Sequence, residues 1–494
     1  MSKRKRNRES VVPGGGSDRP AERPFQSDPP PSLARLRLTA TLRDSILGDL
    51  RRLHPFAFER IGFLSLASGN LENGHALLLG LEYHPVPDDQ YVADAMVGAR
   101  IGTEAIRGAI GRVLRTGRGL LHVHLHDHVG QPGFSWQDQA EQPRLISSFV
   151  NADPTVAHGM LVLSRTSAAA WIWLPGDSGP TVPEQITIVG HSMAFTLPRG
   201  REFVKAMPHP LGAGKKGVSE VNDRNSRQSF LGPNSDQVFS QSRIGIAGLG
   251  GGGSHVSQQL AHVGILNPRS FDGDRMEASN LNRLIGASAD DVAKGTPKVE
   301  IARRLYEGVL PNVIPRFVDG RWQDQPELLR GCDIVIGCVD TFAGRHELEV
   351  ACRRYLIPYI DIGMDVHEVE GEPPRMAGQV FLSMPGQPCM WCLQILDEEK
   401  LGREAQRYGD IEGRPQVVWP NGVLASTAVG IAIDLLTGWT RAQTRLVYLM
   451  YDGNTLELRP HPRLEFLGRR PCPHYRDSSV GDPRFRRVRA GGGR

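Results

Sequence analysis

A glycine-rich turn between an apolar run and an amphipathic segment constrains the fold of this 494-residue chain more than any other feature. The run "RIGIAGLG" ends in glycines, and "SHVSQQLAHVGI" follows with apolar residues at helical spacing. A buried strand, a glycine turn and a helix in this order are typical of a nucleotide-binding unit. The glycines let the backbone approach phosphates, and the helix N-terminus attracts their charge. The candidate phosphate-binding residues are Gly248, Gly250, Gly251 and Gly253.

The segments after this turn repeat the alternation of strand and helix. "PRSFDGD" and "CDIVIGCVD" have the pattern of strands, and "KVEIARRLYEGVLP" between them has that of a helix. This order predicts a parallel, doubly wound, Rossmann-like α/β sheet. Asp272 falls at the end of the second strand, where an acidic side chain can bond the hydroxyls of a ribose.

Three polar side chains in quick succession indicate which nucleotide the site takes. Asn280, Arg283 and Lys298 occur in "EASNLNRLIG" and "KGTPKVE". A nicotinamide dehydrogenase has no need of such a cluster, whereas cations are needed where the α-phosphate of a triphosphate is attacked. Asp340 in "GCVDTF" lies at the carboxyl end of a further strand, where an aspartate can hold Mg²⁺. The pattern therefore predicts a site for ATP and Mg²⁺.

In combination, these motifs resemble the ThiF/MoeB/HesA family of adenylyltransferases, which activate ubiquitin-like proteins, over about residues 224–475. The resemblance implies that the glycines cradle phosphates and Asp272 binds ribose. It also implies that the triphosphate is bound by Asn280, Arg283 and Lys298, and that Mg²⁺ is held by Asp340. It also implies that the C-terminal carboxylate of a small protein attacks the α-phosphate, forming an acyl-adenylate and pyrophosphate. In "RNSRQ", Arg227 takes the place of the arginine that reaches the neighbouring protomer's ATP, so a homodimer is expected.

Six cysteines are too few for a disulfide framework in a chain of this length and favour a reducing compartment. Cys389 and Cys392 form a C-x-x-C motif, and the family resemblance implies a structural zinc on this pair and a later one. The later element, "RRPCPHY", offers Cys472 but has Tyr475 where a cysteine would fall. Either His474 completes a Cys₃His zinc set, or the site has lost its metal.

Some relatives form a thioester between a cysteine and the activated protein. No cysteine lies between Cys392 and Cys472, the stretch in which such a residue would be sought. Cys338 falls in an apolar strand and Cys352 in an expected helix, so both read as core residues. Thioester formation within this chain stays open, and adenylation does not depend on it.

The N-terminal half has a second α/β pattern. "TATLRDSILGDLRRLHP" places Ile46, Leu47, Leu50 and Leu53 on one face of a helix. A second helix is expected at "GTEAIRGAIGRVLRTG". Strands are expected at "IGFLSLA", "HALLLGLEYHPV", "GLLHVHLH", "HGMLVLS" and "AAAWIWLP". This order predicts an α/β layer with short connections.

The strand "GLLHVHLH" begins a row of histidines at every second position: His122, His124, His126 and His128. Alternate side chains share one face of a strand. Two such histidines and one carboxylate make three zinc ligands and leave the fourth position open, as in catalytic zinc sites. Glu59, at the start of the first of these strands, is the candidate general base.

This constellation resembles the JAMM/MPN zinc isopeptidases over roughly residues 35–195, although the family proline after the second histidine is absent. The resemblance implies zinc ligation by two histidines and Asp138, with Ser135 donating a hydrogen bond to the developing oxyanion. The spacing to Ser135 and Asp138 fits neither histidine pair as usually written. We favour His124 with His126 over His126 with His128, because one extra loop residue is easily absorbed. The alternative is a histidine-rich strand without a metal.

The length predicts more than one domain. We expect a disordered basic leader (1–31), a zinc-peptidase-like domain (32–198), and a linker that carries the arginine segment (199–240). An adenylyltransferase domain (241–478) and a basic tail (479–494) follow. No apolar run follows the charged first residues, so we expect a cytoplasmic protein without a secretory signal. The most membrane-like run, 423–439, is short and carries Asp434, which favours a core helix. Much of the positive charge lies at the two ends, so nucleic acid is not an expected partner.

The leading hypothesis is that one chain both activates the tail of a ubiquitin-like protein and, through zinc, processes or removes that protein. Tethering raises the local concentration of one site for the product of the other. A conjugating enzyme would then be a further partner. One alternative is activation of a sulfur-carrier protein for cofactor or natural-product biosynthesis, with a sulfur donor as partner. Another is an adenylyltransferase whose zinc-peptidase-like domain only binds the carrier.

Overall fold

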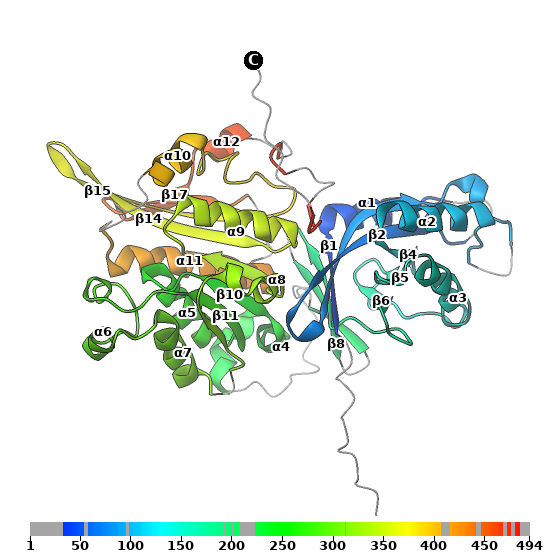
Figure 1. Cartoon of the computed structure of the whole chain (residues 1–494), viewed down its shortest axis with the longest axis horizontal. Coiled ribbons are helices and arrows are strands. Elements are labelled where there is room, and N and C mark those ends of the chain that lie inside the picture. Colours follow the sequence, from blue (N-terminus) through cyan, green and yellow to red (C-terminus); the bar gives the residue numbers. More distant parts are fainter. Residues whose placement is uncertain are drawn as a thin grey trace, which may run out of the picture. The chain divides into compact units, whose positions relative to one another are not determined.

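The computed structural model describes eleven ranges of the chain, which together carry two β-sheets (Figure 1). The ranges are 33–53, 58–94, 98–190, 193–199, 202–206, 223–311, 313–406, 415–440, 446–467, 472–475 and 480–484. Ser32–Arg494 form one compact unit. The expected leader, and the expected tail apart from residues 480–484, lie outside the described residues.

The N-terminal part folds around a nine-stranded mixed sheet with the order β6-β5-β4-β2-β3-β1-β7-β8-β9. The strands are β1 (Ala34–Thr39), β2 (Ile61–Asn70), β3 (Ala76–Pro85), β4 (Gly119–Leu125), β5 (His158–Leu163), β6 (Ala168–Trp173), β7 (Gln185–Val189), β8 (Ala194–Arg199) and β9 (Glu202–Ala206). The helices are α1 (Ala40–Leu50), α2 (Thr103–Thr116) and α3 (Trp136–Ala152), with 3₁₀ turns η1 (Glu72–Gly74) and η2 (Asp88–Gln90). The sequence pattern did not predict five of these elements: β1, β7, β8, β9 and α3.

The two faces of this sheet are covered by different helices. Leu121 and Val123 of β4 belong to the core cluster of α1, whereas Leu120 belongs to the cluster of α2 and α3. Because side chains alternate along a strand, His122 and His124 face the side of α2 and α3. The helix α1 ends at Leu50, earlier than expected, and Leu53 is 97% exposed rather than part of its apolar face.

The C-terminal part contains an eight-stranded sheet with the order β12-β11-β10-β13-β14-β15-β16-β17. The strands are β10 (Arg243–Ala247), β11 (Asn267–Asp272), β12 (Arg316–Asp319), β13 (Ile334–Gly337), β14 (Tyr359–Val369), β15 (Glu372–Ser383), β16 (Tyr448–Asp452) and β17 (Glu457–Pro460). The first five strands in this order are parallel, as expected for a Rossmann-like unit. The sheet as a whole is mixed, because β15, β16 and β17 add antiparallel pairs that the alternation does not predict.

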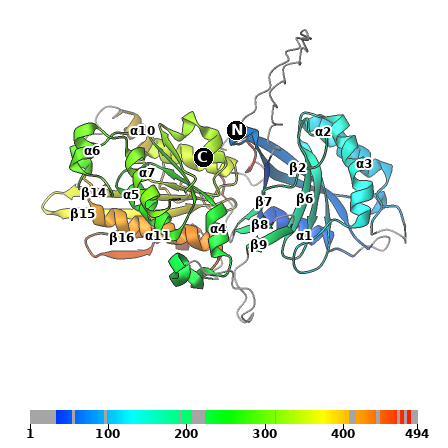
Figure 2. The ribbon, with the colours of Figure 1, turned by 90° about the horizontal axis from the view of Figure 1, so that it is seen from below.

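The helices of this part are α4 (Ser235–Gln241), α5 (Gly251–Val263), α6 (Ala289–Lys294), α7 (Lys298–Val309), α8 (Pro326–Arg330), α9 (Phe342–Arg354), α10 (Glu398–Gln406), α11 (Val418–Thr437) and α12 (Arg463–Leu467). Three 3₁₀ turns, η3 (Asp223–Leu231), η4 (Ala278–Asn280) and η5 (Trp322–Asp324), complete it. By length and composition α11 could cross a membrane. Its buried residues pack in the main core, and it lies against α5, β14 and β15 (Figure 2). The structure thus places α11 as a core helix.

The described residues of the expected linker, 199–240, form regular elements in both parts of the chain. Strand β9 extends the N-terminal sheet, and η3 and α4 lead into β10. Leu77 and Leu79 of β3 share one apolar cluster with Ile244 of β10 and Ile334 of β13. Charged groups are buried beside this cluster, where Arg35 Nη1 lies 3.0 Å from Asp333 Oδ1. A shared core, rather than a tether, therefore joins the two sheets.

Candidate nucleotide-binding site and metal centres

The glycine turn between β10 and α5 has the close backbone approach that the sequence predicts. Gly248 has a φ of +89°, which disfavours any residue with a side chain. A Cβ atom on Gly253 would stand 1.9 Å from the carbonyl oxygen of Gly248, and one on Gly251 would stand 2.6 Å from Nδ2 of Asn421. Gly250 is the N-cap of α5 and would have open space around a Cβ atom. A helix N-terminus with backbone N–H groups this accessible is the kind of turn at which proteins bind phosphate.

We expect Gly253→Ala to lower the free energy of unfolding by about 1–3 kcal/mol, because the added methyl group must push the turn apart. The same change should abolish ATP binding, measured by isothermal titration calorimetry. Gly250→Ala is the matched control for stability, since its φ is −69° and nothing lies within 4 Å of the added atom. Equal urea denaturation midpoints for the two variants would contradict the role of the close approach.

Asp272 lies at the end of β11, directly beside the glycine turn. Its Oδ2 accepts a hydrogen bond from the backbone of Leu249 at 2.6 Å, and its Oδ1 accepts one from Asp274 at 2.8 Å. Burial raises the pKa of Asp272, and Lys298 acts in the opposite direction. The carboxylate is therefore held at the turn, where a ribose bound along the strand ends would meet it.

The three predicted triphosphate residues lie on the segment that follows β11. Asn280 is buried, and its Oδ1 accepts a hydrogen bond from the backbone of Glu277. The Cδ atom of Arg283 would lie 3.3 Å from a Cβ on Gly251, so this arginine borders the glycine turn. Lys298 begins α7, and its Nζ lies 2.7 Å from Oδ2 of Asp274, a partner that the motif does not predict. The structure brings the three residues to one edge of the sheet.

Asp340 follows β13 and is exposed, next to the N-cap Thr341 of α9. The end of β13 borders the glycine turn, because a Cβ on Gly248 would stand 2.7 Å from the carbonyl oxygen of Cys338. Asp340 thus lies at the carboxyl edge of the parallel strands, as predicted. Arg227 lies in η3 with its side chain exposed.

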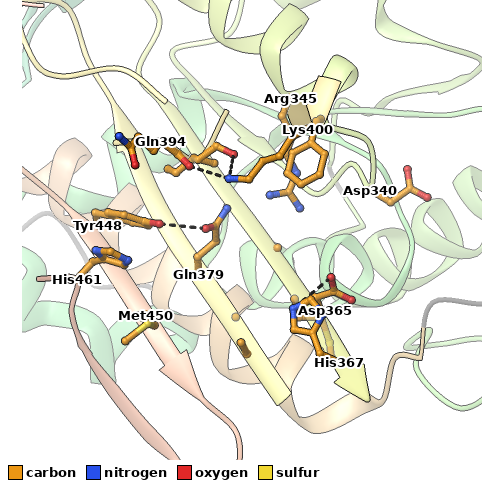
Figure 3. A pocket seen from close by; sticks show the side chains of 16 residues that line it. Asp340, Arg345, Asp365, His367, Gln379, Gln394, Lys400, Tyr448, Met450 and His461 are labelled. Carbon is orange, nitrogen blue, oxygen red and sulfur yellow. Dashed lines mark hydrogen bonds and ion pairs between the residues drawn. The ribbon is translucent and has the colours of Figure 1, made fainter. Parts of the chain in front are cut away.

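A pocket of about 250 Å³ opens from Asp340 across β14, β15 and β16 (Figure 3). Its lining residues are Asp340, Phe342, Arg345, Gly363, Met364, Asp365, His367, Ala377, Gly378, Gln379, Gln394, Ile395, Lys400, Tyr448, Met450 and His461. Apart from Asp340, the motif reasoning does not find these residues. Arg345, a cation that soon follows Asp340 in "VDTFAGRHE", is the one local signal that could have been noticed.

A second cluster lies in the N-terminal sheet, on the face covered by α2 and α3. The Nε2 atom of His124 lies 3.3 Å from Oδ1 of Asp138, and Nε2 of His126 lies 3.7 Å from its Oδ2. Glu59, His124 and His126 offer ligand atoms that all lie within 4.8 Å of one another. His128 is exposed beyond the end of β4, with Nδ1 3.1 Å from the backbone oxygen of Val129. The described residues thus bring together His124 and His126, not His126 and His128.

The surroundings of His124 suit a metal ligand better than an ordinary core residue. His124 is 2% exposed, and its Nδ1 has no hydrogen-bond partner among the described residues. Its Nε2 lies 3.3 Å from the Asp138 carboxylate, and imidazole nitrogen and carboxylate oxygen are both ligand types of zinc. Ser135 is the N-cap of α3. Its Oγ accepts from the backbone of Asp138, and Asp138 Oδ2 accepts from the backbone of Ser135. This capping box holds the carboxylate beside the histidines and leaves the Ser135 hydroxyl hydrogen for donation.

A third cluster joins the C-x-x-C motif to the end of the domain. Sγ of Cys392 lies 3.7 Å from Sγ of Cys389, 3.6 Å from Sγ of Cys472 and 3.4 Å from Nδ1 of His474. Ligands at zinc-bond distances in a tetrahedron lie about 3.4–3.8 Å apart, so the four atoms fit one tetrahedral ion. Tyr475 is buried, with its hydroxyl 3.4 Å from Glu349. His474, and not Tyr475, therefore lies with the three cysteines.

The remaining cysteines lie outside this cluster. Cys332 is buried before β13, Cys352 is buried in α9, and Cys338 is half-buried at the end of β13. Burial raises the pKa of the Cys352 thiol well above its usual value. This disfavours the thiolate that a thioester-forming cysteine needs.

Comparison with known proteins assigns the C-terminal part. The profile of the ThiF family matches residues 223–470. The molybdopterin-synthase adenylyltransferase of Escherichia coli K12 is 31% identical over 227 residues, which cover 45% of this chain and 84% of that protein. The SAMP-activating enzyme E1 of Haloferax volcanii is 34% identical over 176 residues, 35% of this chain and 61% of that protein. The crystal structure of E. coli MccB with ATP aligns at 21% identity and a TM-score of 0.40, covering 49% of this chain and 71% of that one. The chain belongs to the ThiF family.

Proposed function

We propose that this chain catalyses the ATP-dependent adenylation of the C-terminal carboxylate of a ubiquitin-like or sulfur-carrier protein. The observation that carries the proposal is the meeting of the glycine turn, Asp272, Arg283 and Asp340 at one edge of the parallel strands. Membership of the ThiF family supports it, as do the names of relatives that are adenylyltransferases or activating enzymes.

In the proposed step, a carboxylate oxygen of the carrier forms a bond to the α-phosphorus of ATP. The bond from the α-phosphorus to the bridging oxygen breaks, and pyrophosphate leaves with the electron pair. Backbone N–H groups of the glycine turn bind phosphate oxygens, and Arg283 and Lys298 neutralise the charge of the transition state. For this, Lys298 must exchange its bond to Asp274 for one to phosphate. Asp340 would hold Mg²⁺, whose charge supplements these cations when it is bound.

We expect ATP–pyrophosphate exchange by the purified full chain only when a ubiquitin-like carrier with a free Gly-Gly end is added. The same carrier with a C-terminal amide should give none, because the amide cannot attack the α-phosphate. Asp340→Ala should lower the exchange rate about 100-fold or more. Asp319→Ala, a loss of an exposed carboxylate at the end of β12, is the control. Exchange that proceeds equally without a carrier would contradict the proposal.

The proposal includes a homodimer, in which Arg227 reaches the partner's nucleotide. Its support is the "RNSRQ" segment and the exposure of Arg227 in η3. Whether the adenylate then meets a sulfur donor or a conjugating enzyme depends on groups outside the sites described above. Both routes share every residue named for the first step.

We further propose that the N-terminal domain is a JAMM/MPN-type zinc hydrolase that processes or deconjugates the same carrier. The supporting observation is that the Nε2 atoms of His124 and His126 both face the Asp138 carboxylate, with Glu59 beside the two histidines. A zinc ion held by the two histidines and Asp138 would supply a Lewis acid for amide hydrolysis. Glu59 would take the proton of the attacking water and pass it to the leaving amine. Ser135 would donate its hydroxyl hydrogen to the oxyanion.

The cysteine cluster is proposed as a structural zinc site of the Cys₃His type. We expect Cys392→Ser to lower the zinc content by about one equivalent per chain, because the ligand set loses a thiolate. The thermal midpoint should also fall, since the zinc joins the loop after β15 to the end of the domain. Metal analysis and calorimetry measure both effects. Cys338→Ser, outside the cluster, is the control, and an unchanged zinc content in Cys392→Ser would contradict the assignment.

A further inference from the structure

The basic side chains that line the pocket beside Asp340 differ in their contacts with the rest of the protein. Lys400 Nζ donates to the backbone oxygens of Gln394 at 2.7 Å and Ile395 at 3.1 Å. His461 stacks on Tyr448, with 4.2 Å between the ring centroids, and its Nδ1 accepts from a backbone N–H. Asp397 Oδ2 lies 3.4 Å from the remaining donor side of Lys400 Nζ, and burial lowers the pKa of His461, so its ring offers a carboxylate no full charge near neutrality.

Arg345 is held differently. Its Nη1 donates to Asp361 at 3.2 Å, and its Nε donates to the backbone oxygen of Val339 at 3.2 Å. A guanidinium has five N–H groups. Among the described residues, the bonds found for Arg345 use Nε and Nη1, so Nη2 can donate to a ligand. Arg345 is 8% exposed and Asp361 is fully buried, and Asp361 also accepts from the hydroxyl of Tyr359 at 2.9 Å. The arginine is thus fixed by a buried ion pair.

The guanidinium of Arg345 occupies space that is free because residue 363 is a glycine. A Cβ atom on Gly363 of β14 would stand 2.1 Å from Nη2 of Arg345, so the guanidinium lies directly over that glycine. Gly363 and Ala377 leave the strand surface in the pocket open to an extended chain of small residues, whereas a Cβ atom on Gly378 would point at Leu424 of α11. In Figure 3, the Arg345 guanidinium lies between Gln379 and Asp340 in the view shown.

The pocket is separate from the phosphate-binding residues and shares only Asp340 with the predicted site. Neither the glycine turn nor the segment of Asn280, Arg283 and Lys298 contributes to its lining. A peptide tail that entered over β14–β16 would therefore end near Arg345, with its last atoms beside Asp340. Arginine is well suited to a carboxylate there, because its planar fork offers parallel N–H groups.

We propose that Arg345, held over Gly363 by Asp361, binds the C-terminal carboxylate of the carrier and aims it at the α-phosphate. This inference rests on the proposed adenylation. It adds a residue that contacts the nucleophile, as distinct from Arg283 and Lys298, which contact the phosphates. The acyl oxygen that Arg345 holds before the attack remains in the acyl-adenylate, so the contact persists in the product.

The test uses two probes on the full chain: ATP alone, and glycylglycyl-sulfamoyl-adenosine, a stable mimic of the acyl-adenylate. Because Arg345→Gln alone leaves the buried Asp361 without its positively charged partner, the main variant is Arg345→Gln with Asp361→Asn, which replaces the ion pair by an amide pair of similar shape. We expect this variant to bind the mimic about 10- to 100-fold more weakly, while its affinity for ATP changes less than about threefold. Arg345→Lys keeps the charge but not the planar fork, so its affinity for the mimic should lie between those of the double variant and the unmodified chain.

Arg303→Gln, which removes an exposed arginine of α7, is the control for the loss of one positive charge and should leave both affinities unchanged. Unchanged circular dichroism and thermal midpoint show that the double variant is folded. If the folded double variant binds the mimic as the unmodified chain does, or loses ATP and mimic equally, the role of Arg345 is refuted. If the unmodified chain binds neither probe, the adenylation proposal itself fails.

Discussion

Glu59→Gln is expected to lower amide-bond cleavage by the N-terminal domain by about 10²–10⁴-fold without changing its zinc content. Glutamine keeps the shape of the side chain but cannot accept the proton of the attacking water. Glu59 is well placed for this task, because its ligand atom lies within 4.8 Å of those of His124 and His126. Its backbone N–H bonds to Gly98, and its carboxyl carbon lies 3.0 Å from where a Cβ of Gly98 would stand. The side chain is therefore positioned by packing.

Cleavage would be followed on a ubiquitin-like carrier extended past its Gly-Gly end by a fluorogenic amide, and zinc by metal analysis of the same samples. His126→Ala should lose both zinc and activity. His128→Ala should lose neither, because His128 lies outside the cluster. Stoichiometric zinc in the unmodified chain without cleavage would favour a carrier-binding scaffold over a hydrolase. Full cleavage activity in Glu59→Gln would contradict the assignment of the base.

The second large effect is on stability. Asp333→Ala should lower the free energy of unfolding by about 3–5 kcal/mol, because it removes the fully buried carboxylate beside Arg35 and leaves that arginine only the half-buried Glu184. Asp333 accepts from Arg35 Nη1 at 3.0 Å, from Gln185 Nε2 at 2.9 Å and from the backbone of Arg243 at 2.9 Å. Arg37 lies beside this group and donates to three backbone oxygens, those of Arg330, Cys332 and Tyr355. The variant therefore weakens the contact between the two sheets as well as the local fold.

Urea denaturation measures this difference, and its pH dependence supplies a second test. Burial alone would raise the pKa of Asp333, but Arg35 and Arg37 hold it below its usual range. A carboxylate with a lowered folded-state pKa stabilises fully above the ordinary value of about 4, and this contribution is lost as pH falls through the folded-state pKa. The difference between Asp333→Ala and the unmodified chain should thus be constant near neutrality and shrink only in acid.

Asp290→Ala is the control, since the Asp290–Lys294 pair is exposed and should contribute within about 0.5 kcal/mol. Because β3 shares one apolar cluster with β10 and β13, both sheets should unfold in one transition. A change below about 1 kcal/mol in Asp333→Ala at neutral pH would show that the buried network does not support the fold.

The C-terminal fold shows which strands local sequence patterns can predict and which they cannot. The βαβ alternation predicted the parallel strands β10, β11 and β13, because each precedes a helical segment, but it did not predict β12 or β14. It did not predict β15–β17, since the long antiparallel pair β14–β15 alternates polar and apolar residues without a helix between. The pocket lies on these unpredicted strands, which is why its residues were missed apart from Asp340.

The sequence by itself determined the features whose residues are neighbours along the chain: the glycine turn, the C-x-x-C motif and the row of histidines. Their chemistry follows from residue type and strand or helix periodicity, which need no distant contact. Only the tertiary structure decided which histidines meet Asp138, that His474 lies beside Cys392, and that Asp361 fixes Arg345 over Gly363. It also decided that Arg35 pairs with Asp333, 298 residues away. These contacts join separate segments, and burial forces such charged and metal-binding groups to find partners that periodicity cannot specify.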